Sequence, residues 1–347
     1  PKPSSAASDV YKRQAGNWSP SAPVAGDSVV IDIAAGTITA VPTLSLQALT
    51  ISANCTLDAS GAGSTLTING NLSVASGSTT GLTAKVGLAF ASSSVITING
   101  TLNMASAFTG SNDITLGASG IINGSATFTL NAGATMRIGS VNGIAAGNVA
   151  SGNIQVTGSR TYDPGAHYIY NGTASQSTGD GLPTGLTGSL TIDNPTTVTL
   201  AAARTMTTGT LNLKQGTFAA GTLMTLGNST TAANATINRS EGTITGTLQG
   251  ANWYNIIYTG NSKSVGSGAA MSGAGFRNAT VNLNAGQSLT LTTDVTIPGI
   301  LTLTAGTITT GAFKVILSGT ATSSLSGGSS TSFVNGNLQR SIAAGGG

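Results

Sequence analysis

The chain repeats itself at a fixed distance. Residues 209–217 (GTLNLKQGT) return as residues 299–307 (GILTLTAGT), and residues 246–249 (GTLQ) return as residues 336–339 (GNLQ), in both cases 90 residues later. Within each copy the two motifs begin 37 residues apart, which divides the period into blocks of 37 and 53 residues. A fixed period of this kind is typical of stacked β units, because stacking buries a continuous core that no single unit buries alone.

Apolar and polar residues alternate along most of the chain, and no segment has a helical apolar period. Alternation of this kind predicts short strands with one side in a core. The motif Asn-Gly-x-Leu occurs at residues 69–72 and again at residues 99–102. We expect its glycine to form a corner with a positive φ. The expected strands include residues 28–33, 49–52, 66–74, 96–104, 125–130, 189–192 and 288–291.

These strands could form an antiparallel sandwich or barrel, or a solenoid whose coils stack in parallel. We favour the parallel β-helix or β-solenoid, an all-β fold built from short strands with Gly and Asn corners. Thr and Asn recur at matched places, as ladders of like residues require. Charged residues make up only 7% of the chain, which also fits, because like charges stacked on neighbouring strands repel.

The chain divides into three predicted segments. Residues 9–14 (DVYKRQ) are one translation of GATGTGTATAAGAGACAG, which resembles a transposase adapter of sequencing libraries. We therefore interpret residues 1–14 as a non-native, adapter-derived segment and exclude them from fold reasoning. Residues 15–165 are predicted to form irregular solenoid coils. Residues 166–347 are predicted to form coils with the 90-residue repeat, truncated at the C-terminus, so that the chain is a metagenomic fragment of a longer protein.

Charge and apolar content exclude several partners. Without residues 1–14, the 13 basic and 10 acidic groups fall to 10 and 9, and no Lys/Arg cluster remains to bind nucleic acid. No apolar run approaches the ~18 residues of a membrane-spanning helix. Cys55 is the single cysteine and is interpreted as a small buried apolar residue.

Several motifs, in their order along the chain, resemble large secreted or surface proteins of Gram-negative bacteria with β-helical, pectin-lyase-like repeats. The motifs are Gly16–Ser19 with Pro23 and Gly26–Ile31, Tyr170–Thr173 with Gln176 and Leu182–Pro183, Trp253–Ile256, and Phe333–Arg340. The resemblance covers most of residues 15–340. It implies adhesin-like or matrix roles, an extracellular or cell-surface location and, for many members, export by the type IX route. It supplies no catalytic residues.

The residues indicate no enzyme active site. His167 is the single histidine, and no G-x-S-x-G elbow accompanies it. Two carboxylates across a cleft would be needed to hydrolyse a polysaccharide. The candidates, none of which forms a local pair, are Asp163, Asp180, Asp193, Glu241 and Asp294. The chain lacks calcium-roll repeats and zinc-type Cys/His clusters, so no metal or cofactor is expected.

Aromatic residues are the remaining candidates for binding. Trp253, Tyr254 and Tyr258 cluster in the sequence. If exposed, they could stack on sugar rings, since these side chains have an apolar face and a polar tip. The alternative interpretation is that they cover the core at a repeat boundary. Surface glycans or other cell-surface proteins are the expected partners.

Three functions remain open. The first is an extracellular structural or adhesin-like solenoid segment without catalysis, which acts through many weak contacts. The second is a carbohydrate-binding or polysaccharide-degrading β-helix, which would need charged side chains from distant coils to converge in one groove. The third is an ice-binding solenoid, suggested by Thr-x-Thr steps such as Thr302/Thr304. We favour the first.

Overall fold

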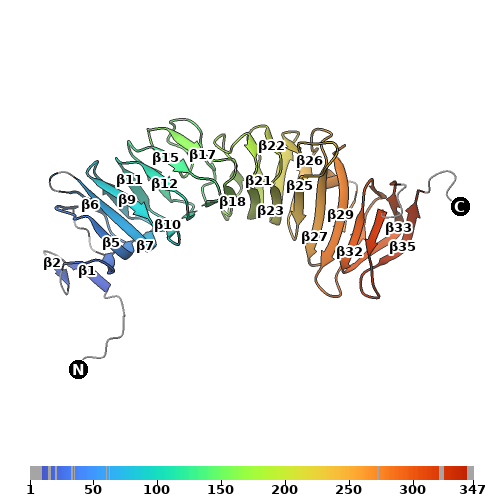
Figure 1. The fold of residues 1–347 in the computed structure, drawn as a ribbon, viewed down its shortest axis with the longest axis horizontal. Helices are drawn as coiled ribbons and strands as arrows, with labels where there is room; N and C mark the ends of the chain where they lie inside the picture. The colour runs from blue at the N-terminus through green and yellow to red at the C-terminus, as the bar shows by residue number, and fades with distance from the viewer. Residues whose placement is uncertain are drawn as a thin grey trace, which may run out of the picture. The chain divides into compact units, whose positions relative to one another are not determined.

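The computed structural model describes residues 10–14, 17–19, 22–32, 34, 36–59, 61, 63–266, 268–271, 273–319 and 324–341. Nearly all regular structure in this part of the chain is strand, and the predicted parallel β-solenoid is confirmed (Figure 1). The one short helix of the described residues is the 3₁₀ turn η1 (Ala269–Met271). The chain divides into two compact units: Pro1–Gly172 with Thr178–Leu182, and Thr173–Ser177 with Pro183–Gly347.

The first unit has three groups of hydrogen-bonded strands, almost all parallel. The first group is β1 (Val10–Gln14), β2 (Asn17–Ser19), β3 (Ser28–Ile31), β5 (Leu44–Ile51), β7 (Ser64–Val74), β9 (Val86–Phe90), β10 (Val95–Ile98), β13 (Asp113–Leu116), β16 (Thr135–Ile138) and β18 (His167–Tyr170). The second is β4 (Gly36–Ile38), β6 (Cys55–Leu57), β8 (Thr79–Leu82), β11 (Thr101–Met104) and β14 (Ile121–Asn123). The third is β12 (Phe108–Gly110), β15 (Phe128–Leu130) and β17 (Arg160–Tyr162).

The second unit also has three groups of hydrogen-bonded strands. Its first group is β19 (Gln176–Ser177), β21 (Ser189–Thr199), β23 (Thr210–Gly221), β25 (Ala235–Arg239), β26 (Thr243–Gly246), β27 (Tyr254–Gly260), β29 (Phe276–Leu283), β32 (Leu301–Ala305) and β34 (Leu325–Gly327). Its second is β20 (Gly185–Leu186), β22 (Arg204–Met206) and β24 (Met224–Leu226). Its third is β28 (Lys263–Val265), β30 (Ser288–Leu291), β31 (Val295–Ile297), β33 (Thr307–Leu317) and β35 (Val334–Arg340).

The core of the first unit is a set of stacked columns. Successive side chains of a strand point to opposite faces, so every second residue enters the core, and parallel pairing places it on its counterpart one coil earlier. Phe108 and Phe128 are such a pair, with ring centroids 5.5 Å apart. Phe90 and Tyr162 extend this aromatic column by ring contacts, at 5.5 Å from Phe108 and 5.8 Å from Phe128, although the register partner of Phe128 is Arg160. Another column, whose members are all buried, is Leu49, Leu72, Ile96, Ile114, Met136 and Tyr168.

The 90-residue repeat corresponds to four coils of the second unit. Four parallel pairings lead from Leu211 through Ile237, Ile256 and Ala279 to Leu301. The chain thus returns to an equivalent position after four coils of unequal length. The 37 residues between the motifs that begin at Gly209 and Gly246 do not correspond to one coil, because Gly246 pairs with Gly221 and not with Gly209.

The distance between the two Asn-Gly-x-Leu motifs, at residues 69–72 and 99–102, does not correspond to one coil either. Leu72 pairs with Ile96 in the first group of strands, whereas Leu102 pairs with Thr80 in the second group. The prediction of a positive φ at both glycines was also wrong, since Gly70 and Gly100 are absent from the positive-φ residues. Their lack of a side chain has another cause: an added Cβ would lie 2.5 Å from the Gln47 carbonyl oxygen or 2.2 Å from that of Ala75.

The repeated glycines of the second unit fall into two classes. Gly209 and Gly299 begin the two copies of the repeat, and each lies against the preceding coil. An added Cβ would approach the Gly188 carbonyl oxygen to 1.7 Å in the first copy and Asn278 Oδ1 to 2.2 Å in the second. Gly246 and Gly336 also lie against a neighbouring coil, where an added Cβ would be 2.1 Å from the Gly221 carbonyl oxygen or from Thr310 Oγ1. They differ in having φ of 102° and 123°, where residues with a Cβ are strained.

Ladders of polar side chains follow the strands on their outer faces, as the sequence predicts. Asn278 donates to Asn255 Oδ1 at 2.7 Å, Asn284 to Asn261 Oδ1 at 3.1 Å, and Asn238 to Asn212 Oδ1 at 3.4 Å. The hydroxyl groups of Thr217 and Thr243 lie 3.1 Å apart. These contacts join side chains one coil apart, so they stabilise the stack of coils.

Part of residues 1–14, the segment interpreted as adapter-derived, forms a strand. Residues 1–9 lie outside the described residues, but Val10–Gln14 forms β1, antiparallel to β2 and parallel to β3. An exposed sheet edge offers unpaired backbone groups to any extended segment, so pairing there does not require a native sequence.

Candidate functional site

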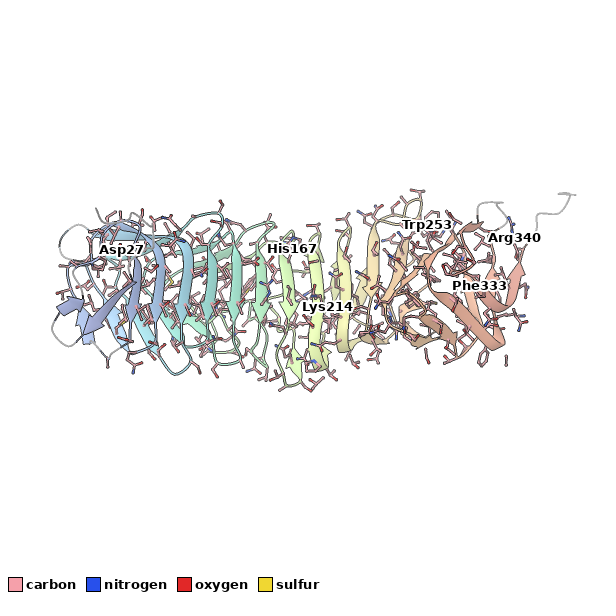
Figure 2. The ribbon with its side chains drawn as sticks, turned by 90° about the horizontal axis from the view of Figure 1, so that it is seen from below. Asp27, His167, Lys214, Trp253, Phe333 and Arg340 are labelled. Carbon is pink, nitrogen blue, oxygen red and sulfur yellow. The ribbon has the colours of Figure 1, made fainter. Side chains whose placement is uncertain are left out.

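Two of the three aromatic residues predicted to bind sugars are core residues. Tyr254 and Tyr258 lie on β27 and are 2% and 1% exposed, and the Tyr254 hydroxyl donates to the Ala270 carbonyl at 3.0 Å. Alternation along β27 directs both rings inward, together with Ile256. The predicted three-residue stacking surface is therefore reduced to Trp253, which precedes β27 and is half-buried (Figure 2).

Burial also changes the chemistry of these tyrosines. It raises the pKa of Tyr258 to about 12, against the smaller opposite effect of Arg239, whose guanidinium lies 6.0 Å from the ring. The pKa values of Tyr168 and Tyr254 are likewise raised by burial. These phenols are neutral and structural at physiological pH.

Trp253 lies in a groove of the second unit with a cavity volume of about 740 Å³. The Cζ atom of Arg277 lies 4.0 Å from the centroid of the Trp253 ring, so the guanidinium covers one face of the indole. The described residues of the groove come from four successive segments: Thr231–Ala233, Trp253, Arg277–Asn278 and Pro298–Ile300, followed by Ser318, Gly319 and Ser324.

A β-bulge positions Arg277. Tyr254 pairs with Phe276 and Asn255 pairs with Asn278, so Arg277 is the extra residue between two consecutive pairs. Bulges re-aim side chains out of the regular alternation, and this one places Arg277 beside Trp253. The floor below is fixed by Asn278, which donates to Asn255 and accepts from the Ile300 amide at 2.8 Å.

Two groups in the groove have unused hydrogen-bonding capacity within the described part of the chain. No hydrogen bond or ion pair joins the Arg277 guanidinium to a described residue, although this group has five N–H donors. Ser324 is 2% exposed, and its Oγ has no hydrogen-bond partner. A buried hydroxyl without a partner costs about 1–3 kcal/mol, which a bound ligand could offset.

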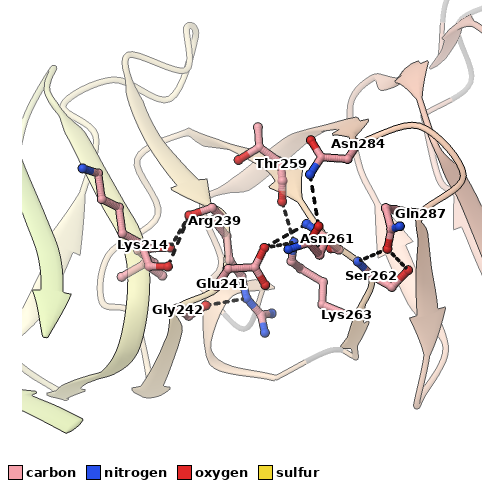
Figure 3. Close-up of polar contacts among 12 residues, drawn as sticks. Lys214, Arg239, Glu241, Gly242, Thr259, Asn261, Ser262, Lys263, Asn284 and Gln287 are labelled. Atoms are coloured by element: carbon pink, nitrogen blue, oxygen red, sulfur yellow. Dashed lines mark hydrogen bonds and ion pairs between the residues drawn. The ribbon is translucent and has the colours of Figure 1, made fainter. Parts of the chain in front are cut away.

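A second polar cluster lies on β25, β27, the turns that follow them and the first residue of β28, and its side chains contact one another and nearby backbone (Figure 3). The Lys263 ammonium donates to the carbonyls of Thr259 and Asn261 and lies 4.0 Å from Glu241 Oε1. Two hydrogen bonds and one ion pair therefore engage the ammonium group. Glu241 Oε1 also accepts from the Asn261 amide at 2.8 Å. Burial lowers the pKa of Lys263, and Glu241 partly offsets this. The cluster holds two neighbouring turns together.

The carboxylates considered in the sequence are dispersed. Asp193, Glu241 and Asp294 each pair with a lysine, at 3.6 to 4.0 Å. Asp163 and Asp180 accept hydrogen bonds from the backbone amides of Gly165 and Ala146. Asp113 on β13 pairs with Arg137 on the neighbouring β16, at 3.3 Å. In each of these four ion pairs the acidic residue precedes the basic residue in the sequence, and the two lie one coil apart.

The remaining sequence candidates contribute no cluster. His167 is half-buried on β18, in register with Thr135 (Figure 2). Cys55 is a free, buried cysteine as predicted, and burial raises the pKa of its thiol. Among the described residues, no three His, Cys, Asp or Glu side chains gather as a metal site would require. No described helix is long and apolar enough to cross a membrane.

The sequence singled out Trp253 as a candidate but did not single out Arg277. The length of the coil could have indicated it. Arg277 follows Trp253 by about one coil, which is the distance along the chain between the paired strands β27 and β29. In comparisons with known proteins, no family model, no curated protein and no solved structure matches the chain. The candidate site therefore rests on its own geometry.

Proposed function

We propose that this chain is an extracellular structural segment of a larger bacterial surface protein, with an adhesin-like role and no catalysis of its own. One observation carries the proposal: charged and amide side chains of the described coils mostly contact their counterparts one coil away. A scaffold uses its polar groups in this way, whereas an active site gathers them around a substrate. The resemblance to secreted repeat proteins supports the location.

An adhesin-like scaffold acts by summing weak contacts along its length. Beads coated densely with the purified chain should therefore be retained on glycan-coated surfaces, while the soluble chain should bind the same surfaces weakly. Retention should fall steeply as the coating density is lowered. Equal retention at all densities, or none on any glycan surface, would contradict the proposed role.

The enzymatic alternative is tested by turnover on acidic and neutral polysaccharides, measured as new reducing ends or unsaturated products. We expect none above buffer. The Lys263–Glu241 cluster supplies a control, since Glu241→Gln removes the carboxylate and leaves the groove of Trp253 intact. Turnover that disappears in Glu241→Gln would replace the structural proposal by a catalytic one. The ice-binding alternative predicts thermal hysteresis, which we do not expect.

A further inference from the structure

We propose that the groove of Trp253 and Arg277 binds an acidic saccharide, with Arg277 receiving a carboxylate of a uronic acid. This inference deepens the proposed adhesin-like function by naming its ligand class. It requires only that the isolated chain binds such a ligand in solution, so it can fail or succeed independently of bead adhesion.

The state of Arg277 indicates an anionic ligand. Its guanidinium lies over the Trp253 ring, with 4.0 Å between Cζ and the ring centroid. Contact with the ring uses no N–H donor of the guanidinium, and no described residue accepts a hydrogen bond from it. A planar fork of this kind matches a carboxylate in a two-point hydrogen bond. No described residue of the groove is acidic, so no internal carboxylate takes this place.

The rest of the groove indicates a saccharide. Its volume of about 740 Å³ lies within the range of about 300–1,000 Å³ of small-molecule sites. Hydroxyl side chains of Thr231, Ser318 and Ser324 line it, and Ser324 Oγ is buried without a partner. Sugar hydroxyls both donate and accept, as such a wall requires. Pro298 and Ile300, the latter 38% exposed, supply apolar surface for the C–H face of a sugar ring.

The groove is also held in shape before any ligand binds. Gly299 lies so close to the neighbouring coil that an added Cβ would be 2.2 Å from Asn278 Oδ1 and 2.7 Å from the Arg277 carbonyl oxygen. The Gly299 amide donates to that carbonyl at 2.8 Å. The Pro298–Ile300 wall therefore cannot move away from Arg277 without breaking these contacts, and a preorganised site loses less entropy on binding.

The test is isothermal titration calorimetry of the full chain with trigalacturonate and with its fully methyl-esterified form, which keeps the rings but removes the charge. We expect the ester to bind at least about tenfold more weakly, because a neutral ester cannot accept the charge-assisted hydrogen bonds that a carboxylate accepts from a guanidinium. Affinity for the acid should fall as salt is added. Equal binding of acid and ester, or no binding of either, would overturn the proposal.

Two variants assign the site. Arg277→Gln should weaken trigalacturonate binding about tenfold or more, whereas Arg137→Gln, a matched change in the first unit, should leave it unchanged. If Arg277→Gln fails to fold, Arg277→Lys keeps the charge but loses the fork and should still bind more weakly. Wild-type affinity in either variant would overturn the site. Inorganic phosphate bound as tightly as trigalacturonate would show a general anion site and overturn the saccharide assignment.

Discussion

At the scale of single residues, glycine allows the coils to approach one another closely. Gly209 lies against Gly188 of the preceding coil without a positive φ, so its role is to leave space rather than to permit an unusual backbone. Gly185 lies on β20, has an ordinary φ, and an added Cβ there would meet nothing within 4 Å. The two positions therefore share an ordinary φ and differ in how closely the neighbouring coil approaches.

This contrast predicts the effect of adding one methyl group. Gly209→Ala should lower the free energy of unfolding by about 2–3 kcal/mol, because the Cβ clashes with a backbone carbonyl and the coil must shift. Gly185→Ala should change it by less than about 0.5 kcal/mol. Denaturant titration followed by circular dichroism measures both. Similar losses in the two variants would show that close approach is not what requires Gly209.

Buried tyrosines predict a loss of stability at alkaline pH. The folded-state pKa of Tyr258 is about 12, above the unfolded value of about 10. Its contribution is therefore complete below pH ~10 and is lost as pH rises toward 12, by up to about 2–3 kcal/mol. Stability measured from pH 8 to 12 should fall over this range, and less so in Tyr258→Phe. A tyrosinate absorbance titration of the native protein centred near pH 10 would contradict this account.

At the scale of elements, the internal aromatic column of the first unit concentrates stability. Phe108 is 1% exposed and lies between Phe90 and Phe128. Stacked aromatic pairs stabilise beyond their buried area. Phe333, before β35 of the second unit, is 41% exposed and provides a matched position outside a core.

Phe108→Ala should therefore destabilise the coils around it by about 3–5 kcal/mol, and Phe333→Ala should cost less than about 1 kcal/mol. Because coils of a solenoid contact mainly their neighbours, hydrogen exchange should rise first in β12, β15 and β9. Exchange in the strands of the second unit should change little. A uniform increase over the whole chain would indicate a single cooperative unit instead.

Strands were predicted well from the sequence, and the length of each coil was not. Alternation placed the expected strands at residues 189–192 and 288–291, which lie in β21 and β30. The coils of the repeat differ in length, the longest leading from Leu211 to Ile237 and the shortest from Ile237 to Ile256, since loops at the corners vary without disturbing the core. Arg277 was missed for this reason: its contact with Trp253 depends on the length of one coil and on a bulge that leaves no mark in the hydrophobic pattern.

At the scale of the whole molecule, the second unit carries an exposed edge. β35 pairs with β33, and no other described strand pairs with it. Leu338, in register with the buried Val315, is 41% exposed. Open edges of this kind are templates for pairing with another chain. The exposed leucine adds apolar surface to the same edge.

Self-association through this edge is therefore expected at high protein concentration. Leu338→Lys should reduce it, because a charge on an edge strand disfavours pairing, whereas Val141→Lys, at a 49% exposed position in the first unit, should not. Sedimentation velocity over a concentration series measures the effect. If the wild type, Leu338→Lys and Val141→Lys associate equally, self-association does not involve the edge formed by β35.

The four-coil return of the chain has a consequence for how such a protein can change in length. Because Leu301 occupies the position that Leu211 occupies four coils earlier, a gene segment encoding residues 209–298 can be duplicated or deleted with the core columns still in register at the junction. With strands about 4.8 Å apart, each such event would lengthen or shorten the second unit by about 19 Å. Unequal recombination within the gene would therefore produce size variants in whole 90-residue steps, rather than a continuous range.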